Sequence, residues 1–159
     1  MNNPTIYEQL PAVKAPEIEI YYKTSVFKSE RPRISQPDDI YNLMFSIGEM
    51  SRNMEYKELF YSLYLNNDND ILAVHKISEG TTKSTLVDTK FIMQGAIMTN
   101  AAALVICHNH PGGNTQPSAA DRRLTQKIQQ AAQLFDINLL DSVIITADNY
   151  FSMRAEGML

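Results

Sequence analysis

Residues 101–121 read AAALVICHNHPGGNTQPSAAD, and this stretch is the most informative part of the chain about its structure. Its first seven residues are all apolar, which is typical of a strand that is covered on both faces of a sheet. A loop rich in glycine and proline follows, and Ser118 after Pro117 is a natural helix N-cap. The stretch therefore predicts a buried strand, a tight loop and the start of a helix.

The segments on either side complete an α/β pattern. Runs rich in strand-forming residues or in apolar residues predict strands at 59–65, 71–77, 101–107, 139–146 and 150–153. Helices are predicted from Ser35, as the capping residue, to about Ser51, and again over about 88–99. A third helix shows apolar residues at helical spacing, at Leu124, Ile128, Ala131 and Phe135. We expect an α/β protein with a single mixed β-sheet and flanking helices.

Residues 1–34 differ from the rest of the chain. Four prolines interrupt them, and proline removes a backbone hydrogen-bond donor. Residues 17–22, EIEIYY, alternate between polar and apolar side chains, as a half-exposed strand does. We interpret 1–34 as an N-terminal arm with a possible edge strand, which could pair with a neighbouring chain. A largely disordered tail is the alternative, and 35–159 form the predicted domain.

Composition excludes several classes of protein. The chain has 159 residues, of which 44% are hydrophobic, so it can bury the core of one domain. Its net charge of −4 disfavours nucleic acid as the main partner, although a local basic patch would still fit. No apolar run reaches the roughly 18 residues of a membrane span, and residues 1–4 do not resemble a secretory signal. Cys107 is the sole cysteine, and we expect a cytoplasmic protein.

The chemistry concentrates in the loop after the buried strand. In an extended segment His108 and His110 point the same way, so both rings can bind one ion, while Cys107 and Asn109 point the other way. The loop can bring back Asp121, in the first turn of the next helix, as a third ligand. Two histidines and one carboxylate leave a fourth tetrahedral position for water, which is typical of catalytic zinc. Taken alone, Ser118 and Asp121 would also be explained as a helix-capping box.

The same residues resemble a known family. His108, His110 and Asp121, with Ser118 three residues before the aspartate, are similar to the JAMM (MPN-plus) metalloprotease motif. More narrowly, the sequence HNHP at 108–111 and the later Thr125 resemble the RadC family, whose members are often labelled DNA repair proteins. The likeness extends from about Ser35 to the C-terminus.

The resemblance implies a fold and an activity. It implies the JAMM/MPN (cytidine-deaminase-like) fold and a zinc metallopeptidase or isopeptidase that cleaves an amide bond in a peptide or an isopeptide-linked protein. It also places a general base at Glu58, just before the strand that follows the first helix; Glu55 is the alternative. By the same resemblance Ser118 would stabilise the tetrahedral oxyanion.

The sequence departs from the family pattern in two places, and it is also compatible with other functions. Family members usually begin with a helix-hairpin-helix segment, whereas this chain has the short arm, and they commonly have histidine where Ser142 follows Asp141. A DNA-repair-associated accessory protein without proteolytic activity is the alternative function, and a non-catalytic scaffold is a third. A zinc deaminase is disfavoured, because its His-x-Glu and Cys-x-x-Cys elements are absent.

Overall fold

A single mixed sheet forms the centre of the computed structural model, which describes residues 22, 24–80 and 86–159. Within these residues its strands are β1 (Leu59–Leu65), β2 (Ile71–Glu79), β3 (Ala103–Asn109), β4 (Asn138–Ile145) and β5 (Tyr150–Ser152). Their order across the sheet is β2-β1-β3-β4-β5. β3 and β4 run parallel, and the other neighbours are antiparallel.

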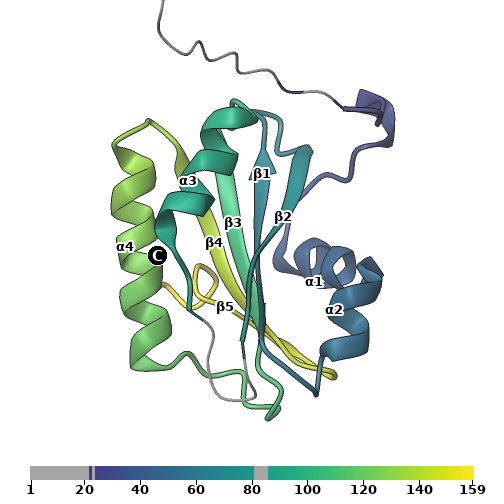
Figure 1. The fold of residues 1–159 in the computed structure, drawn as a ribbon, viewed down its shortest axis with the longest axis vertical. Helices are drawn as coiled ribbons and strands as arrows, with labels where there is room; N and C mark the ends of the chain where they lie inside the picture. Colours follow the sequence, from purple (N-terminus) through teal and green to yellow (C-terminus); the bar gives the residue numbers. More distant parts are fainter. Residues whose placement is uncertain (1–21, 23, 81–85) are drawn as a thin grey trace, which may run out of the picture.

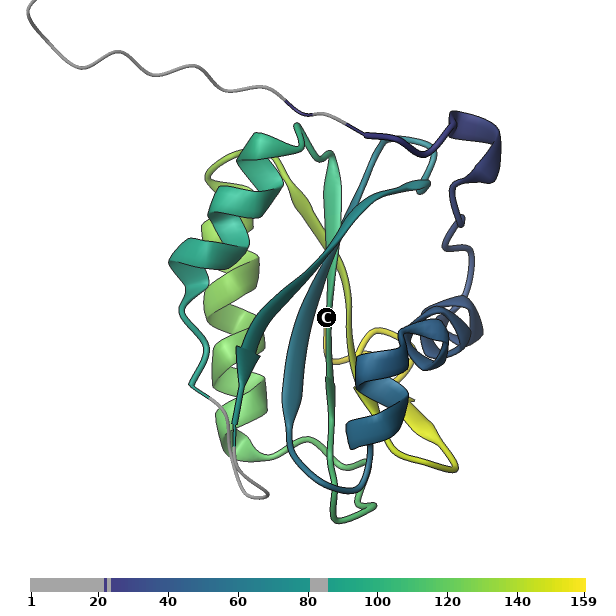
Figure 2. The same ribbon diagram turned by 45° about the vertical axis from the view of Figure 1, so that its right-hand side comes forward.

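Helices cover both faces of this sheet. α3 (Thr89–Met98) and α4 (Ala119–Gln133) lie on one face, and α1 (Pro37–Ser46) and α2 (Gly48–Asn53) lie on the other (Figures 1 and 2). The parallel pair β3 and β4 is joined through α4, as a parallel connection requires. The predicted α/β class, with one mixed sheet and flanking helices, is confirmed.

Alternation along the strands divides the buried side chains into two cores. Leu63, Val105 and Cys107 face α1 and α2, whereas Phe60, Leu104 and Ile106 face α3 and α4. Both layers are needed because every residue of β1 and β3 is buried. A strand that is covered on both sides explains the uninterrupted apolar run that marks β3 in the sequence.

The first predicted helix begins one residue later than expected. Gln36, not Ser35, is the N-cap of α1, and Pro37 follows at the first helical position. The Asp39 carboxylate accepts hydrogen bonds from the backbone N–H groups of Ser35 at 2.7 Å and Gln36 at 3.0 Å. These bonds are the carboxylate half of a capping box, in which the acidic residue at N3 accepts from the backbone at the N-cap.

That helix is also not continuous to Ser51. At Ile47 the backbone is extended, with φ −78° and ψ 104°, and a second helix starts at Gly48. The break keeps the apolar face intact, because Met44 and Met50 both have no exposed surface. A continuous apolar pattern therefore hid a change in backbone direction.

Other predicted boundaries shift by a few residues. β3 starts at Ala103 instead of Ala101 and continues through Asn109, and β2 extends to Glu79. α4 stops at Gln133, so Phe135 lies beyond its end with 52% of its surface exposed. The predicted N-terminal strand at 17–22 lies outside the described residues except for Tyr22, and the division into arm and domain stays a prediction. Among the described residues, no helix has the length and apolar character needed to cross a membrane.

Candidate metal centre

The carboxyl end of β3 holds the first candidate ligand rigidly. His108 pairs with Phe60 on β1 and with Ile144 on β4, so strands flank it on both sides. Its ring stacks on Phe60 at a centroid distance of 5.7 Å and an interplanar angle of 12°. Only 3% of the His108 side chain is exposed. The ring orientation is therefore determined by the sheet and its α3/α4 core.

The loop after β3 orients the second histidine. The His110 N–H donates to Ile145 O at 3.0 Å, and a turn follows in which Gly113 has a φ of +77°. His110 Nδ1 lies 2.6 Å from Asn114 O. A carbonyl can only accept, so Nδ1 carries the proton and the neutral ring presents its Nε2 lone pair to the cluster.

The first turn of α4 supplies the carboxylate. Ser118 is the N-cap, and its Oγ accepts from the Asp121 N–H at 3.2 Å. In return, Asp121 Oδ2 accepts from the Ser118 N–H at 2.7 Å, which completes a capping box. The capping interpretation and the ligand interpretation are thus compatible, because Asp121 also reaches the histidines.

The three side chains converge, as the sequence predicts. His108 Nε2 and His110 Nε2 are 3.0 Å apart, and the Asp121 oxygens lie 3.4 Å from His108 Nε2 and 3.7 Å from His110 Nε2. Ligands about 2.0–2.1 Å from a tetrahedral ion are separated by about 3.3–3.4 Å. The candidate ligand atoms have similar separations, with Asp121 Oδ1 toward His108 and Oδ2 toward His110. This group could hold a metal ion.

The electrostatics of the cluster also favour a cation. Burial alone would raise the pKa of Asp121, but hydrogen bonds with His108 and Ser118 outweigh it and hold that pKa well below its usual range. An ionised carboxylate therefore lies beside the Nε2 lone pair of His110, and a cation bound between them would interact favourably with both. His110 and Asp121 keep 20% and 16% of their side-chain surface exposed, which leaves the cluster open on one side.

One candidate ligand has a ring nitrogen without a hydrogen-bond partner among the described residues. This atom is the buried His108 Nδ1. Metal-ligating histidines usually donate this second N–H to an acceptor. The stacking on Phe60 replaces that orienting contact here.

The two glutamates proposed as general base occupy different surroundings. Glu58 has 9% of its surface exposed, and its carbonyl accepts from Gly80 N at 2.9 Å, which continues the β1–β2 ladder. Alternation from Phe60 then places Glu58 on the same face of the sheet as His108. Glu55 is exposed and lines a cavity of about 270 Å³ together with His110. The assignment of either residue as the base stays a prediction.

The remaining predicted positions have structural partners. Cys107 is fully buried in the α1/α2 core, and burial raises the pKa of its thiol, as expected for a residue that is not a ligand or nucleophile. Ser142, which stands where the RadC resemblance leads one to expect histidine, lies 3.0 Å from the Thr125 hydroxyl of α4. A short polar pair therefore fills that place between β4 and α4.

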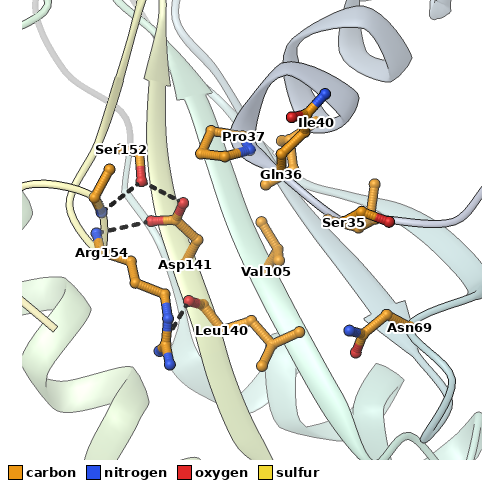
Figure 3. A pocket seen from close by; sticks show the side chains of 12 residues that line it. Ser35, Gln36, Pro37, Ile40, Asn69, Val105, Leu140, Asp141, Ser152 and Arg154 are labelled. Atoms are coloured by element: carbon orange, nitrogen blue, oxygen red, sulfur yellow. Dashed lines mark hydrogen bonds between the residues drawn. The ribbon is translucent and has the colours of Figure 1, made fainter.

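A second cavity lies on the α1 side of the sheet, opposite the face to which His108 points (Figure 3). It measures about 370 Å³ and opens between the start of α1, strands β3 and β4, and residues 152–155. Its buried carboxylate, Asp141, accepts from Ser142 N at 2.7 Å, Ser152 Oγ at 2.6 Å and Arg154 N at 3.1 Å. Asp141 thus holds the turn after β5 to β4, and it takes no part in the metal cluster.

Asn109 is the residue whose importance the sequence did not indicate. It lies between the two histidines, has no exposed surface, and bonds the backbone of the α2–β1 connection. The only local signal was an amide inside a buried strand. Its partners lie 50–56 residues earlier in the chain, so the local sequence does not indicate what the amide binds.

Comparisons with known proteins point to one family. A family model described as the RadC-like JAB domain matches residues 34–158. The chain is 35% identical over 127 residues to the UPF0758 protein of Flavobacterium johnsoniae, covering 79% of this chain and 53% of that protein. It is 36% identical over 144 residues to the UPF0758 protein of Rubrobacter xylanophilus, covering 89% and 61%. Against UPF0758 protein YfjY of Escherichia coli it is 39% identical over 103 residues, covering 65% and 64%. The chain therefore spans between 53% and 64% of the length of these relatives.

Proposed function

The chain belongs to the family of RadC-like JAB domains, and from that premise we propose that it is a zinc-dependent metallopeptidase or isopeptidase. The observation that carries the proposal is the convergence of three side chains: His108 Nε2 lies 3.0 Å from His110 Nε2 and 3.4 Å from Asp121 Oδ1, and Asp121 Oδ2 lies 3.7 Å from His110 Nε2. These separations are close to the roughly 3.3–3.4 Å between the ligands of a tetrahedral zinc ion. Two histidines and one carboxylate leave one position open, which is the arrangement of a hydrolytic centre. Nitrogen and oxygen donors in this number suit zinc.

Each ligand has a defined task in the proposed centre. His108 and His110 bind through Nε2, and Asp121 binds through its carboxylate. When bound, the ion would lower the pKa of a coordinated water to about 7 and polarise the substrate carbonyl. Asn114 O fixes the proton of His110 on Nδ1, and the Ser118 N–H fixes the Asp121 carboxylate, so both ligands are oriented before a metal binds.

Glu58 and Ser118 complete the proposed reaction. The Glu58 carboxylate accepts a proton from the attacking water and delivers it to the leaving amine. Its burial and its place on the same face of the sheet as His108 support this role. The Ser118 hydroxyl donates to the oxygen of the tetrahedral intermediate while its lone pair caps α4. The substrate we propose is a peptide or an isopeptide-linked protein, in the cytoplasm.

Metal content is the first test of the proposal. Protein purified without added metal should contain close to one zinc per chain by inductively coupled plasma mass spectrometry. The double substitution His108→Ala with His110→Ala should remove it. Because Cys107 is buried on the other face, Cys107→Ala should retain the metal and serves as the control. Full zinc occupancy in the double histidine variant would overturn the site.

Hydrolysis is the second test. The zinc-loaded protein should be incubated with a complex peptide mixture and with isopeptide-linked model conjugates, and new amino termini identified by mass spectrometry. Cleavage should disappear with a chelator, return with zinc, and fall at least about 100-fold in Glu58→Gln, as expected for loss of a general base. If Glu55→Gln abolishes cleavage and Glu58→Gln does not, the base is Glu55.

One observation favours the alternative, a DNA-associated accessory function. α4 begins at the metal cluster, and Arg122, Arg123 and Lys127 add positive charge to its first turns in an acidic chain. Such a local patch could contact phosphates, and binding would then weaken steeply as salt rises. A gel shift at low salt on duplex and branched DNA tests this. Loss of binding in Arg122→Ala with Arg123→Ala would support the alternative, and no binding by the unaltered protein would remove it.

A further inference from the structure

Asn109 is buried between the two histidines and bonds a distant part of the chain. Its Oδ1 accepts from the Leu59 N–H at 2.7 Å, and its Nδ2 donates to Met54 O and Lys57 O, both at 2.9 Å. Asn53 O lies 3.4 Å from the same nitrogen. Both amide hydrogens and the amide oxygen are therefore in use. Because side chains alternate along β3, the amide faces α2 while His108 faces α4.

These bonds hold the backbone on both sides of Glu58. Lys57 O belongs to the peptide group that joins Lys57 to Glu58, and the Leu59 N–H belongs to the peptide group that joins Glu58 to Leu59. One side chain thus fixes both peptide planes of Glu58. The Gly80 N–H holds the second of these planes from the opposite side, through Glu58 O. The α2–β1 connection and the carboxyl end of β3 lie at the same end of the sheet (Figure 1).

We propose that Asn109 is a positioning residue that couples the metal ligands to the general base Glu58. The inference rests on the function proposed above. His108 and Asn109 are consecutive on a rigid strand, so any displacement of the ligands moves the amide and, through it, the Glu58 backbone. A catalytic group must be held to within about 0.5 Å of its productive position, and a direct link between ligand strand and base provides this.

The chemistry of the position selects asparagine. Aspartate could accept from Leu59 N but would leave the Met54 and Lys57 carbonyls without a donor. Alanine would leave the carbonyls and the Leu59 N–H unpaired in a buried place. Part of the role is structural, because Asn53 and Met54 carbonyls at the end of α2 need donors. The test must therefore separate positioning of Glu58 from support of the fold.

Cobalt(II) bound in place of zinc gives a visible absorption spectrum. The pH midpoint of its change would report the ionisation of the water molecule that occupies the fourth ligand position. We expect Glu58→Gln to remove a negative charge beside that ligand and to lower the midpoint by about one pH unit. Asn109→Ser should lower the midpoint in the same direction while retaining one metal per chain. The double variant should lie no lower than Glu58→Gln alone, because both changes remove the same interaction.

A matched control exists at the other end of β1. Asn66 also holds a turn with its amide: its Oδ1 accepts from Asp68 N and Asp70 N, both at 2.9 Å. Asn66→Ser makes the same substitution far from the ligands and should leave the midpoint unchanged. A midpoint unchanged in Asn109→Ser but lowered in Glu58→Gln would overturn the positioning role and leave the proposed function intact. A midpoint unchanged in Glu58→Gln would overturn Glu58 as the base, and with it this inference.

The unaltered protein gives a second measurement that does not depend on a folded variant. If Asn109 couples ligands and base, zinc should slow hydrogen exchange of the Leu59 amide, which donates to Asn109. The Asp70 amide, which donates to Asn66, should exchange at the same rate with and without zinc. Equal exchange of the Leu59 amide in both states would overturn the inference.

Discussion

Ser118 caps α4, and single substitutions can separate this role from the catalytic role that we propose for it. Its Oγ caps α4, and we propose that its hydrogen stabilises the oxyanion. Ser118→Ala should cost about 1 kcal/mol of stability, whereas Ser118→Gly should cost only a few tenths, because glycine is a tolerated N-cap. Both variants should lose about 100-fold in hydrolysis if the hydroxyl stabilises the transition state. Urea unfolding and the peptide cleavage assay measure the two effects.

Threonine provides the control for that pair of substitutions. Ser118→Thr keeps a hydroxyl at the N-cap, so it should retain both stability and most of the activity. If Ser118→Gly cleaves as fast as the unaltered protein, Ser118 is a cap only.

The ion pair of Arg33 and Asp70 should make the free energy of unfolding depend on pH. Arg33 Nε donates to Asp70 Oδ1 at 2.9 Å, and this bond, together with one from Asn66, lowers the pKa of Asp70 below its ordinary 3.8. A carboxyl with a depressed pKa stabilises the fold above its unfolded pKa, and that stability is lost as pH falls through the folded value. Arg33→Gln should therefore destabilise the protein at neutral pH and have less effect near about pH 2.

The test is to measure the urea midpoint of unfolding for the unaltered protein and for Arg33→Gln, from neutral pH down to about pH 2. Arg33 also pairs with Asp70 through the backbone, in an isolated antiparallel bridge that glutamine preserves. A difference in midpoint that stays constant down to low pH would show that the Asp70 charge does not contribute.

At the scale of elements, Gly95 is required where α3 crosses β1. A Cβ at this position would lie 2.1 Å from Tyr64 Oη and 2.3 Å from its Cζ. The Tyr64 ring cannot move away, because it is 1% exposed and its hydroxyl donates to Ile92 O at 3.0 Å. Gly95→Ala gains about 1 kcal/mol of helix propensity but forces overpacking that costs typically 1–3 kcal/mol or more. We expect net destabilisation in urea unfolding.

Gly48 is the matched glycine. A Cβ there would lie 3.0 Å from Arg52 Nη1, the end of a flexible side chain that can swing away. Gly48→Ala should therefore be neutral or stabilising by up to about 1 kcal/mol. Equal stability of the two alanine variants would contradict the role given to the α3–Tyr64 contact.

The elements show what local pattern can and cannot predict. The apolar run predicted β3 but ended it at Cys107, because His108 and Asn109 are polar. The ladder with β4 continues through both, up to the pair of Asn109 with Ile145. The His108 ring stacks on Phe60 and the Asn109 amide bonds the α2–β1 connection, and the local sequence pattern reveals neither contact. Likewise, the apolar face of α1 and α2 ran on across the break at Ile47.

The candidate site likewise contains residues that the local sequence pattern can predict and residues that it cannot. His108, His110 and Asp121 could be predicted because they lie within one strand–loop–helix unit whose spacing determines their directions. Glu58 was selected by family resemblance alone, since fifty residues separate it from the ligands. Asn109 was missed as a link because its partners become neighbours only when β1 pairs with β3. Residues that are remote in sequence need the sheet register before they can be assigned.

At the scale of the whole molecule, the metal would tie together parts that already pack without it. The candidate ligands lie at the end of β3 and in the first turn of α4. α4 also buries Ile128 and Ala132, which have no exposed surface. This differs from small zinc domains, whose folding depends on the metal because they have no sufficient core. Here each face of the sheet has its own apolar cluster.

Removal of zinc should therefore lower the melting temperature without unfolding the protein. At free zinc 100 times the dissociation constant, binding contributes about 2.7 kcal/mol. For a chain of this size each kcal/mol corresponds to roughly 2–4 °C, so chelation should lower Tm by about 5–10 °C. Far-UV circular dichroism at 25 °C should be unchanged. Asp121→Asn should show a smaller response to the chelator, because it weakens one ligand. Loss of secondary structure on chelation at 25 °C would mean that the two apolar cores do not suffice to hold α4 on the sheet.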